Sequence, residues 1–175
     1  MTRDELTNYI SMFKQNDYTC FNQFYKETSK QVYFTALGIL KDHQLAEGIL
    51  QETYVSFLES IDNFKKGTSI YGYLTMIARN KALNYIKKEK RVVHNEDIFN
   101  TLSDYSSEIR YEIGVDKILA LLDKQIEREI VTYHVILEYK FAEISQITKK
   151  PIGTVLWIYN QAMKVLKSRI GELYE

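Results

Sequence analysis

The chain has 175 residues, of which 45% are hydrophobic and 13% aromatic, and its formal net charge is zero. This composition argues against a wholly disordered chain, and seven glycines with one proline favour helices over a turn-rich β fold. A single cysteine excludes an internal disulfide, and the polar N-terminus with no apolar run of membrane length leads us to expect a cytoplasmic protein.

The charges are segregated along the chain although they cancel in total. Residues 42–62 hold five acids and neither Lys nor Arg. Residues 65–91 hold eight cations against one acid, and residues 92–116 hold six acids against one cation. The neutral average, which alone argues mildly against nucleic acid, therefore hides a basic segment between two acidic ones.

Hydrophobic spacing predicts helices throughout the first half of the chain. The earliest helices are expected at about residues 6–13 and 18–40. Asp42 is a suitable N-cap for the next helix. Gly67 breaks the pattern, and a further helix is expected at about residues 70–89.

The second half begins with a polar, acidic stretch, residues 92–113, that has no clear period and is interpreted as a flexible linker. Helical periodicity returns from Val115, and a closing helix is expected from Pro151, which suits a first turn. We predict an all-α fold of two small helical domains, residues 1–91 and 114–175, joined by this linker.

The basic helix expected after residue 70 has two faces. A stripe predicted to be buried holds Leu74, Ile77, Ala78 and Tyr85. A second face combines an aromatic ring, amides and cations, namely Tyr73, Met76, Asn80, Asn84, Lys87 and Arg91. Rings that stack on bases, amides that bond base edges and cations that meet phosphates are what single-stranded nucleic acid requires. The preceding loop, residues 65–69, could hold an extruded base. An ordinary solvated surface helix is an equal alternative.

The chain contains, in this order, AEGILQETYVSF, FKKGTSIYGYLTMIARNKALNYIKKEKR and FAEISQITKKPIGTVLWIYNQAMKVLK. Together these segments, over roughly residues 18–170, resemble the bacterial sigma-70 family, specifically its short extracytoplasmic-function (ECF) type. The resemblance implies a promoter-specific transcription initiation factor. The implied partners are core RNA polymerase, promoter DNA and a regulatory anti-sigma protein.

The resemblance also assigns surfaces. It implies that residues 42–60 dock on the polymerase, with these contact residues: Asp42, Glu47, Gln51 and Glu52. It implies that the loop captures a flipped base of the minus-ten element and that the following helix melts the promoter. The implied DNA contacts are Lys65, Lys66, Thr68, Ser69, Tyr71, Tyr73, Asn80, Asn84, Lys87, Lys88 and Arg91.

Three positions depart from the family pattern. Tyr73 stands where the family usually has Trp, and Asn84 where it usually has Asp. Both changes are mild, because a ring is kept and a negative charge is removed from the DNA side. Gly48 replaces a usual Asp, which costs about 1 kcal/mol of helix propensity relative to Ala and removes one acidic contact. We therefore expect a lower affinity for the polymerase.

The closing helix resembles the second helix of a helix-turn-helix, but residues 156–163 carry no charge. Val155, Tyr159, Ala162 and Leu166 are predicted to point inward. The resemblance implies that this helix reads the minus-thirty-five element. Its candidate contact residues, for DNA or for a protein partner, are Thr154, Trp157, Asn160, Gln161 and Lys164.

Three readings of this helix stay open. It enters the major groove, where Asn160 and Gln161 bond adenine edges. Alternatively, Leu156, Trp157 and Ile158 form a protein-docking patch, or they merely complete the core. The docking reading leads to an alternative function, a sigma-like regulatory or co-sigma subunit whose C-terminal domain binds protein. A further alternative is a dimeric helix-turn-helix repressor that acts without polymerase.

The residues give no sign of catalysis. The three histidines, His43, His94 and His134, show no metal-ligand spacing, and the seven glycines form no phosphate-binding loop. No acid–base pair is recognisable. We therefore predict no enzyme activity, no cofactor and no metal.

Overall fold

The computed structural model describes residues 3–65, 67–92 and 114–170. Within these residues the fold is all-α, as predicted, and contains no strand. Most of the predicted linker, residues 93–113, lies outside the described residues, so the division into two domains remains a prediction. We call helices α1–α4 the N-terminal unit and helices α5–α8 the C-terminal unit.

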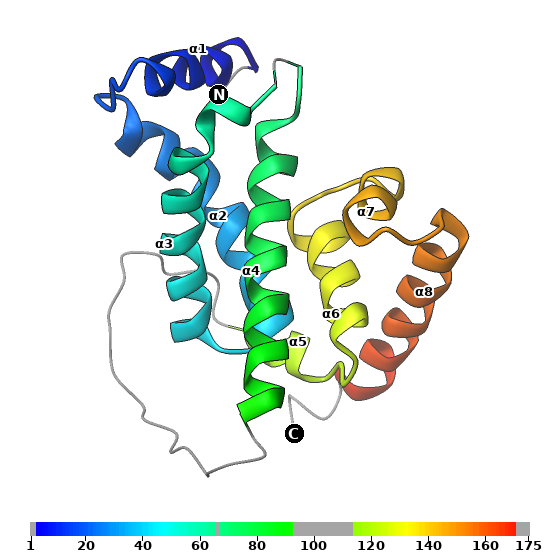
Figure 1. The fold of residues 1–175 in the computed structure, drawn as a ribbon. Helices are drawn as coiled ribbons and strands as arrows, with labels where there is room; N and C mark the ends of the chain where they lie inside the picture. Colours follow the sequence, from blue (N-terminus) through cyan, green and yellow to red (C-terminus); the bar gives the residue numbers. More distant parts are fainter. Residues whose placement is uncertain (1–2, 66, 93–113, 171–175) are drawn as a thin grey trace.

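The N-terminal unit is a bundle of three long helices with a shorter helix across one end (Figure 1). The Asp42 carboxylate accepts a hydrogen bond of 2.8 Å from the backbone N–H of Leu45, which confirms the predicted N-cap. The elements are α1 (Arg3–Lys14), α2 (Phe21–Leu40), α3 (His43–Glu59), a single 3₁₀ turn η1 (Ile61–Asn63) and α4 (Ile70–Val92).

Aromatic side chains from four elements fill the core of this unit. Phe24 and Phe57 stack with ring centroids 5.4 Å apart, and both rings are fully buried. Phe13 inserts edge-on against Phe24, at 5.2 Å, and thereby anchors α1 to the bundle. Because a large buried side chain stabilises by about 1.5–3 kcal/mol, α1 belongs to the folded unit.

The C-terminal unit contains a helix-turn-helix made by its last two helices. Lys149, in the left-handed conformation with φ 55°, turns the chain between them. Ile130, Ile144 and Val155 are fully buried between the helices. The elements are α5 (Val115–Ala120), α6 (Gln125–Val131), a π-helical turn η2 (Thr132–Ile136), α7 (Phe141–Thr148) and α8 (Ile152–Arg169).

Helix α2 is central to the molecule. All of its residues from 32 to 39 are buried. Eight consecutive buried residues point in all directions around a helix, so packing on one face alone cannot bury them. The helix packs against α3 and α4 on one side and against α6 and η2 on the other. The two units therefore share one continuous body, and α6 and α7 lie beside α4 (Figure 1).

Candidate nucleic-acid interface

Helix α4 exposes one face and buries the opposite one. Leu74 and Ala78 have no exposed surface, whereas Asn80 and Asn84 are exposed and Met76 is 42% exposed. Lys87 and Lys88 continue the exposed face toward the C-terminal end. Arg91 lies in the last turn, and its side chain is outside the described residues. The exposed face offers amides and cations to a ligand, while the buried face fixes the helix.

Tyr73 lies at the border between these faces. Its ring is half-buried and packs edge-on against Phe57 and Phe64, with centroids 6.2 and 5.2 Å away. Its hydroxyl lies 3.2 Å from Ser60 Oγ. The ring is therefore held in a fixed orientation and supports the helix as well as lining its surface.

The loop before α4 is held in a tight turn. Gly67 has φ 93°, a conformation that favours glycine. The Thr68 N–H donates to the Lys65 carbonyl at 3.1 Å, and Ser69 Oγ accepts from the Gly72 N–H at 3.3 Å at the start of α4. Lys65, Thr68 and Ser69 are exposed, and Lys66 lies outside the described residues.

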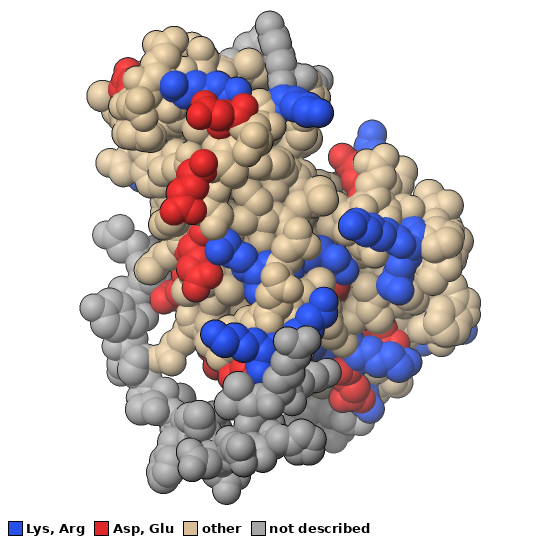
Figure 2. All heavy atoms as spheres, viewed as in Figure 1, with Lys and Arg blue, Asp and Glu red and all other residues tan. Residues whose placement is uncertain are grey.

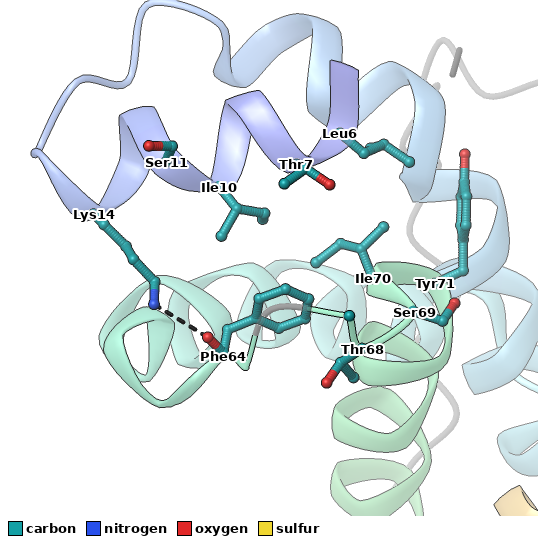
Figure 3. Close-up of a pocket in the computed structure, with 11 residues that line it drawn as sticks. Leu6, Thr7, Ile10, Ser11, Lys14, Phe64, Thr68, Ser69, Ile70 and Tyr71 are labelled. Carbon is teal, nitrogen blue, oxygen red and sulfur yellow. Dashed lines mark hydrogen bonds between the residues drawn. The ribbon is translucent and has the colours of Figure 1, made fainter. Parts of the chain in front are cut away.

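A cavity of about 620 Å³ opens between this loop and α1 (Figure 3). Its walls combine aliphatic side chains, two aromatic rings, hydroxyls and one ammonium group. This size, with apolar and aromatic walls and a few polar groups, is typical of small-ligand sites. The lining residues are Leu6, Thr7, Ile10, Ser11, Lys14, Phe64, Gly67, Thr68, Ser69, Ile70 and Tyr71.

Helix α1 is a part of this site that the sequence reasoning missed. Lys14 Nζ donates to the Phe64 carbonyl at 3.1 Å and to the Asp62 carbonyl at 3.4 Å, and Figure 3 shows the first of these bonds. The lysine thus ties the end of α1 to the chain that enters the loop. The spacing of Leu6, Ile10 and Phe13 predicts the helix, but no sequence signal places it beside this loop.

The outer face of α3 is polar and acidic. Asp42, Gln51 and Glu52 are exposed, and Glu47 is half-buried. Figure 2 shows acids along the edge formed by α3 and cations over α4. Glu52 Oε2 lies 3.3 Å from Lys81 Nζ, so the acidic edge and the basic helix touch.

Two exposed residues complete that face of α3. Val55 lies on it and is 57% exposed, a feature that the sequence reasoning missed. Gly48 is also exposed, and a Cβ added there would meet nothing within 4 Å. The face therefore lacks a side chain at Gly48 and carries an apolar side chain at Val55, and both features favour contact with a protein surface.

Helix α8 presents an apolar patch to solvent. Trp157 is 62% exposed, Ile152 49% and Leu156 38%. Ile158, which we expected either in a docking patch or in the core, is buried. The alternative that these residues merely complete the core is therefore correct for Ile158 and wrong for Trp157. The other candidate residues on this face are exposed, apart from half-buried Gln161: they are Thr154, Asn160 and Lys164.

The inward stripe of α8 differs by one residue from the prediction. Val155, Ala162 and Leu166 are buried as expected. Tyr159 is only half-buried and packs edge-on against His134 and Phe141.

Two other classes of site have no support in the part of the chain that the structure describes. No three His, Cys, Asp or Glu side chains come together there as metal ligands. Within the same residues, no helix is long and apolar enough to cross a membrane.

Comparison with known proteins agrees with this geometry. The sequence pattern of the family "Sigma-70 region 2" matches residues 24–92, which span α2 to α4. The ECF RNA polymerase sigma factor SigM of Bacillus subtilis (strain 168) is 24% identical over 156 residues, which cover 85% of this chain and 95% of SigM. SigW of the same organism, also an ECF RNA polymerase sigma factor, is 23% identical over 94% of this chain and 96% of its own.

Solved structures show the same fold over most of the chain. The sigma factor RpoE, in its complex with the anti-sigma factor NepR from Bartonella quintana, superposes with a TM-score of 0.72 at 19% identity and covers 86% of this chain and 96% of its own. CnrH, in complex with the cytosolic domain of CnrY, gives a TM-score of 0.66 at 14% identity and covers 93% and 95%. A sigma-type fold thus carries the face of α4 and its loop. These findings support an ECF sigma factor of the sigma-70 family: region 2 matches residues 24–92, and the similarity to ECF sigma factors covers most of the chain.

Proposed function

We propose that this chain is a promoter-specific transcription initiation factor that binds core RNA polymerase and recognises and melts promoter DNA. A subunit of this kind makes and breaks no covalent bond; it lowers the cost of strand opening by binding the opened form. The observation that carries the proposal is the exposed row Met76, Asn80 and Asn84 on the helix whose first residues, Ile70 and Tyr71, line the cavity at the loop.

The energetics of this surface suit strand separation. Extruding a base costs a few kcal/mol, and each base that stacks on a protein ring returns about 1–3 kcal/mol. Phe64 and Tyr71 line the cavity that would receive a base, and the amides of Asn80 and Asn84 are free to meet base edges. Lys87 and Lys88, which are exposed toward the C-terminal end of α4, supply phosphate contacts.

The acidic face of α3 is proposed as the polymerase-docking surface. Its exposed Gln51 and Glu52 are suited to a basic partner surface, because complementary charge speeds association and fixes the register of docking. Val55 adds an apolar contact at the same face. The arrangement lets one bundle bind the polymerase on one side and DNA on the other.

In the C-terminal unit, α8 is proposed to contact duplex DNA upstream of the melted site. Asn160 is exposed and its amide is suited to an adenine edge. Lys149, Lys164 and Lys167 are exposed and lie where phosphates would pass. Since both structural neighbours described above are complexes, we propose an anti-sigma protein as a regulatory partner. The cytoplasm, where the polymerase acts, is the proposed location.

The exposed patch of Ile152, Leu156 and Trp157 favours a second candidate function. In it the chain binds polymerase or another sigma subunit as a co-sigma factor, and α8 binds protein. Contiguous exposed apolar patches are a feature of protein-interaction sites.

A transcription assay tests the first candidate. Core polymerase together with this chain should initiate at a promoter that core polymerase alone ignores. Absence of binding to core polymerase at micromolar concentration contradicts the first candidate, and it leaves the second only if the chain binds another sigma subunit. Binding without initiation, and with no sequence-dependent affinity of the full chain for duplex DNA, favours the co-sigma role.

A further inference from the structure

A buried ion pair joins the two units. Arg79, on α4, donates from Nε to a carboxylate oxygen of Glu129, on α6. The Glu129 side chain is 1% exposed and that of Arg79 15%. Glu129 also accepts from Gln125 Nε2 at 3.0 Å and from the Tyr133 hydroxyl at 3.4 Å. Arg79 is thus the cationic partner of a carboxylate that the C-terminal unit has otherwise surrounded with neutral donors.

A second contact of the same kind lies at the end of α2. Arg128 donates from Nε to the Gly38 carbonyl at 3.2 Å and from Nη2 to the Ile39 carbonyl at 3.4 Å. A cation at the C-terminal end of a helix meets carbonyls that lack an intrahelical partner. Two adjacent residues of α6, Arg128 and Glu129, therefore bind two different helices of the N-terminal unit.

Helix α2 and the turn η2 pack closely between these two contacts. A Cβ added to Gly38 would lie 2.5 Å from Thr132 Oγ1 and 3.1 Å from Thr132 Cβ. The Thr132 hydroxyl is the one buried side-chain polar atom without a hydrogen-bond partner in the described part of the chain. A side chain at position 38 would therefore force Thr132 to shift, and the closed packing leaves one polar group unsatisfied.

The closed arrangement covers one flank of α4. Tyr139, from the segment before α7, places its hydroxyl 2.9 Å from Thr75 Oγ1 and also contacts Gln31. Thr75 and Arg79 thus face the C-terminal unit, while Asn80, the neighbour of Arg79, faces solvent. The proposed strand-separating helix keeps its amides exposed and has one of its cations neutralised.

We propose that this is a closed conformation in which Glu129 withholds Arg79 from DNA, and that separation of the units transfers Arg79 to a promoter phosphate. The inference rests on the proposed function and names a regulated contact within it. A DNA phosphate competes for the guanidinium, because Arg binds both anions through the same donors. Glu129, which repels DNA while it lies beside α4, moves away with the C-terminal unit.

The balance between the closed and open conformations is set by the difference in free energy between them. A buried ion pair gives back in desolvation much of what it gains in attraction, and the unsatisfied Thr132 hydroxyl further weakens closure. DNA that binds only the open conformation shifts the population toward it. The apparent affinity for DNA is reduced by the fraction of molecules that are open.

The test uses the full chain with Gly38→Ala, which inserts a methyl group between the units and removes no charged group. Gly48→Ala is the matched control, because it makes the same change within helix α3 where a Cβ meets nothing. Small-angle X-ray scattering should give a larger radius of gyration for Gly38→Ala than for the wild type and Gly48→Ala. Affinity for a single-stranded minus-ten oligonucleotide should rise about tenfold if one wild-type molecule in about ten is open.

Arg79→Met separates opening from DNA contact. It leaves Glu129 buried without its cation, so the units should separate as in Gly38→Ala. The variant lacks the proposed phosphate contact, so its oligonucleotide affinity should stay below that of Gly38→Ala, with a salt slope smaller by about one. Glu129→Gln, which keeps the volume and frees Arg79, should open the units and bind as tightly as Gly38→Ala.

Three results overturn the inference. They are an unchanged radius of gyration in both Gly38→Ala and Glu129→Gln, an increased radius with unchanged oligonucleotide affinity, and equal affinity and salt slope for Arg79→Met and Gly38→Ala. Each can occur while the wild-type chain initiates transcription with core polymerase. Failure of the inference is therefore distinguishable from failure of the proposed function.

Discussion

The ring of Tyr73 meets that of Phe64 edge-on, with centroids 5.2 Å apart and planes inclined by 74°. Phe64 leads into the loop beside the cavity, and Tyr73 lies in the first turns of α4. An aromatic pair in this geometry contributes about 0.5–1.5 kcal/mol beyond the area it buries. The contact therefore couples the position of the loop to that of the helix.

Replacement of Tyr73 should affect both stability and promoter opening. Because the ring is half-buried, Tyr73→Ala should lower the free energy of unfolding by about 2 kcal/mol, below the cost at a fully buried site. Tyr73→Phe keeps the ring and loses only the contact with Ser60, so it should cost about 1 kcal/mol or less. Denaturant unfolding measures the first effect, and permanganate reactivity of promoter thymines measures opening. Full opening with Tyr73→Ala at a concentration where it is folded contradicts the assigned role.

Asn80 separates the DNA role from the structural one. Its side chain is exposed, so Asn80→Ala should change the free energy of unfolding by less than about 0.5 kcal/mol. Loss of one or two hydrogen bonds to a base edge should reduce open-complex formation about three- to tenfold. Asn22→Ala, at an exposed position in the first turn of α2, is the matched control and should open promoters as the wild type does. Equal activity of both variants argues that α4 meets DNA through other residues.

Local features of this fold were predictable from the sequence. The prediction of which side chains are buried failed at positions where burial depends on how the helices pack together. The Asp42 cap needs only one side chain and the start of α3, and both its existence and its position were predicted correctly. In α8, Ile158 and Tyr159 are neighbours on the helix, and either could point inward. Their burial depends on where α6 and α7 lie, and the hydrophobic periodicity of α8 carries no information about that.

Contacts between distant segments were the part that sequence reasoning could not reach. Residues 32–39 of α2 are buried on all sides because a second unit covers them. The pair Arg79 and Glu129 is separated by 50 positions, and no motif joins them. In the sequence, Lys14 likewise has no feature that distinguishes it from an ordinary surface cation. Its contact with the loop becomes visible only when the fold places α1 beside that loop. Each of these contacts arises from tertiary geometry, whereas a helical pattern reports only the face of a single helix.

The outer face of α3 should control affinity for the polymerase. Gln51→Ala combined with Glu52→Ala removes exposed polar contacts and should weaken binding to core polymerase about tenfold, which corresponds to a loss of about 1.4 kcal/mol over the two side chains. Promoter opening at saturating protein should be normal. Surface plasmon resonance with immobilised core polymerase measures the affinity.

A control for this variant comes from the ion pair between Glu52 and Lys81, 3.3 Å apart. Lys81→Ala breaks the same pair without changing α3, and an exposed pair contributes only about 0–1 kcal/mol. It should leave polymerase affinity unchanged. If Lys81→Ala weakens binding as much as the double variant does, the ion pair, and not the acidic face, is the feature that matters.

Trp157 is the only tryptophan in the chain and is 62% exposed, so its fluorescence reports directly on α8. If α8 enters the major groove, promoter duplex should shift the emission to shorter wavelength at low salt, and the shift should disappear as salt rises. Trp157→Ala should weaken duplex binding while changing the free energy of unfolding by less than about 1 kcal/mol. A shift with core polymerase and none with duplex favours the co-sigma role.

Alkaline pH should weaken the contact between the two units through Tyr139. Burial is the main reason why the pKa of Tyr139 is raised from 10.0 to about 12; the carboxylate of Glu143 adds to the rise, and the hydrogen bond with Thr75 opposes it. The folded protein therefore keeps this phenolic proton at pH values where the unfolded chain loses it. The stabilisation is complete below pH 10 and is lost as pH rises toward 12.

Denaturant unfolding between pH 9 and about 11 tests this expectation. The free energy of unfolding should fall with pH less steeply in Tyr139→Phe than in the wild type, because phenylalanine has no proton to lose. Tyr18→Phe removes an exposed tyrosine and should retain the wild-type slope. In a titration followed by phenolate absorbance, the folded Tyr139→Phe variant should ionise one tyrosine fewer than the folded wild type. This difference should be visible only at the most alkaline end of the titration. Parallel slopes for Tyr139→Phe and the wild type contradict the expectation, because they mean that the phenol is accessible to water in the folded chain and that the two units do not seal it.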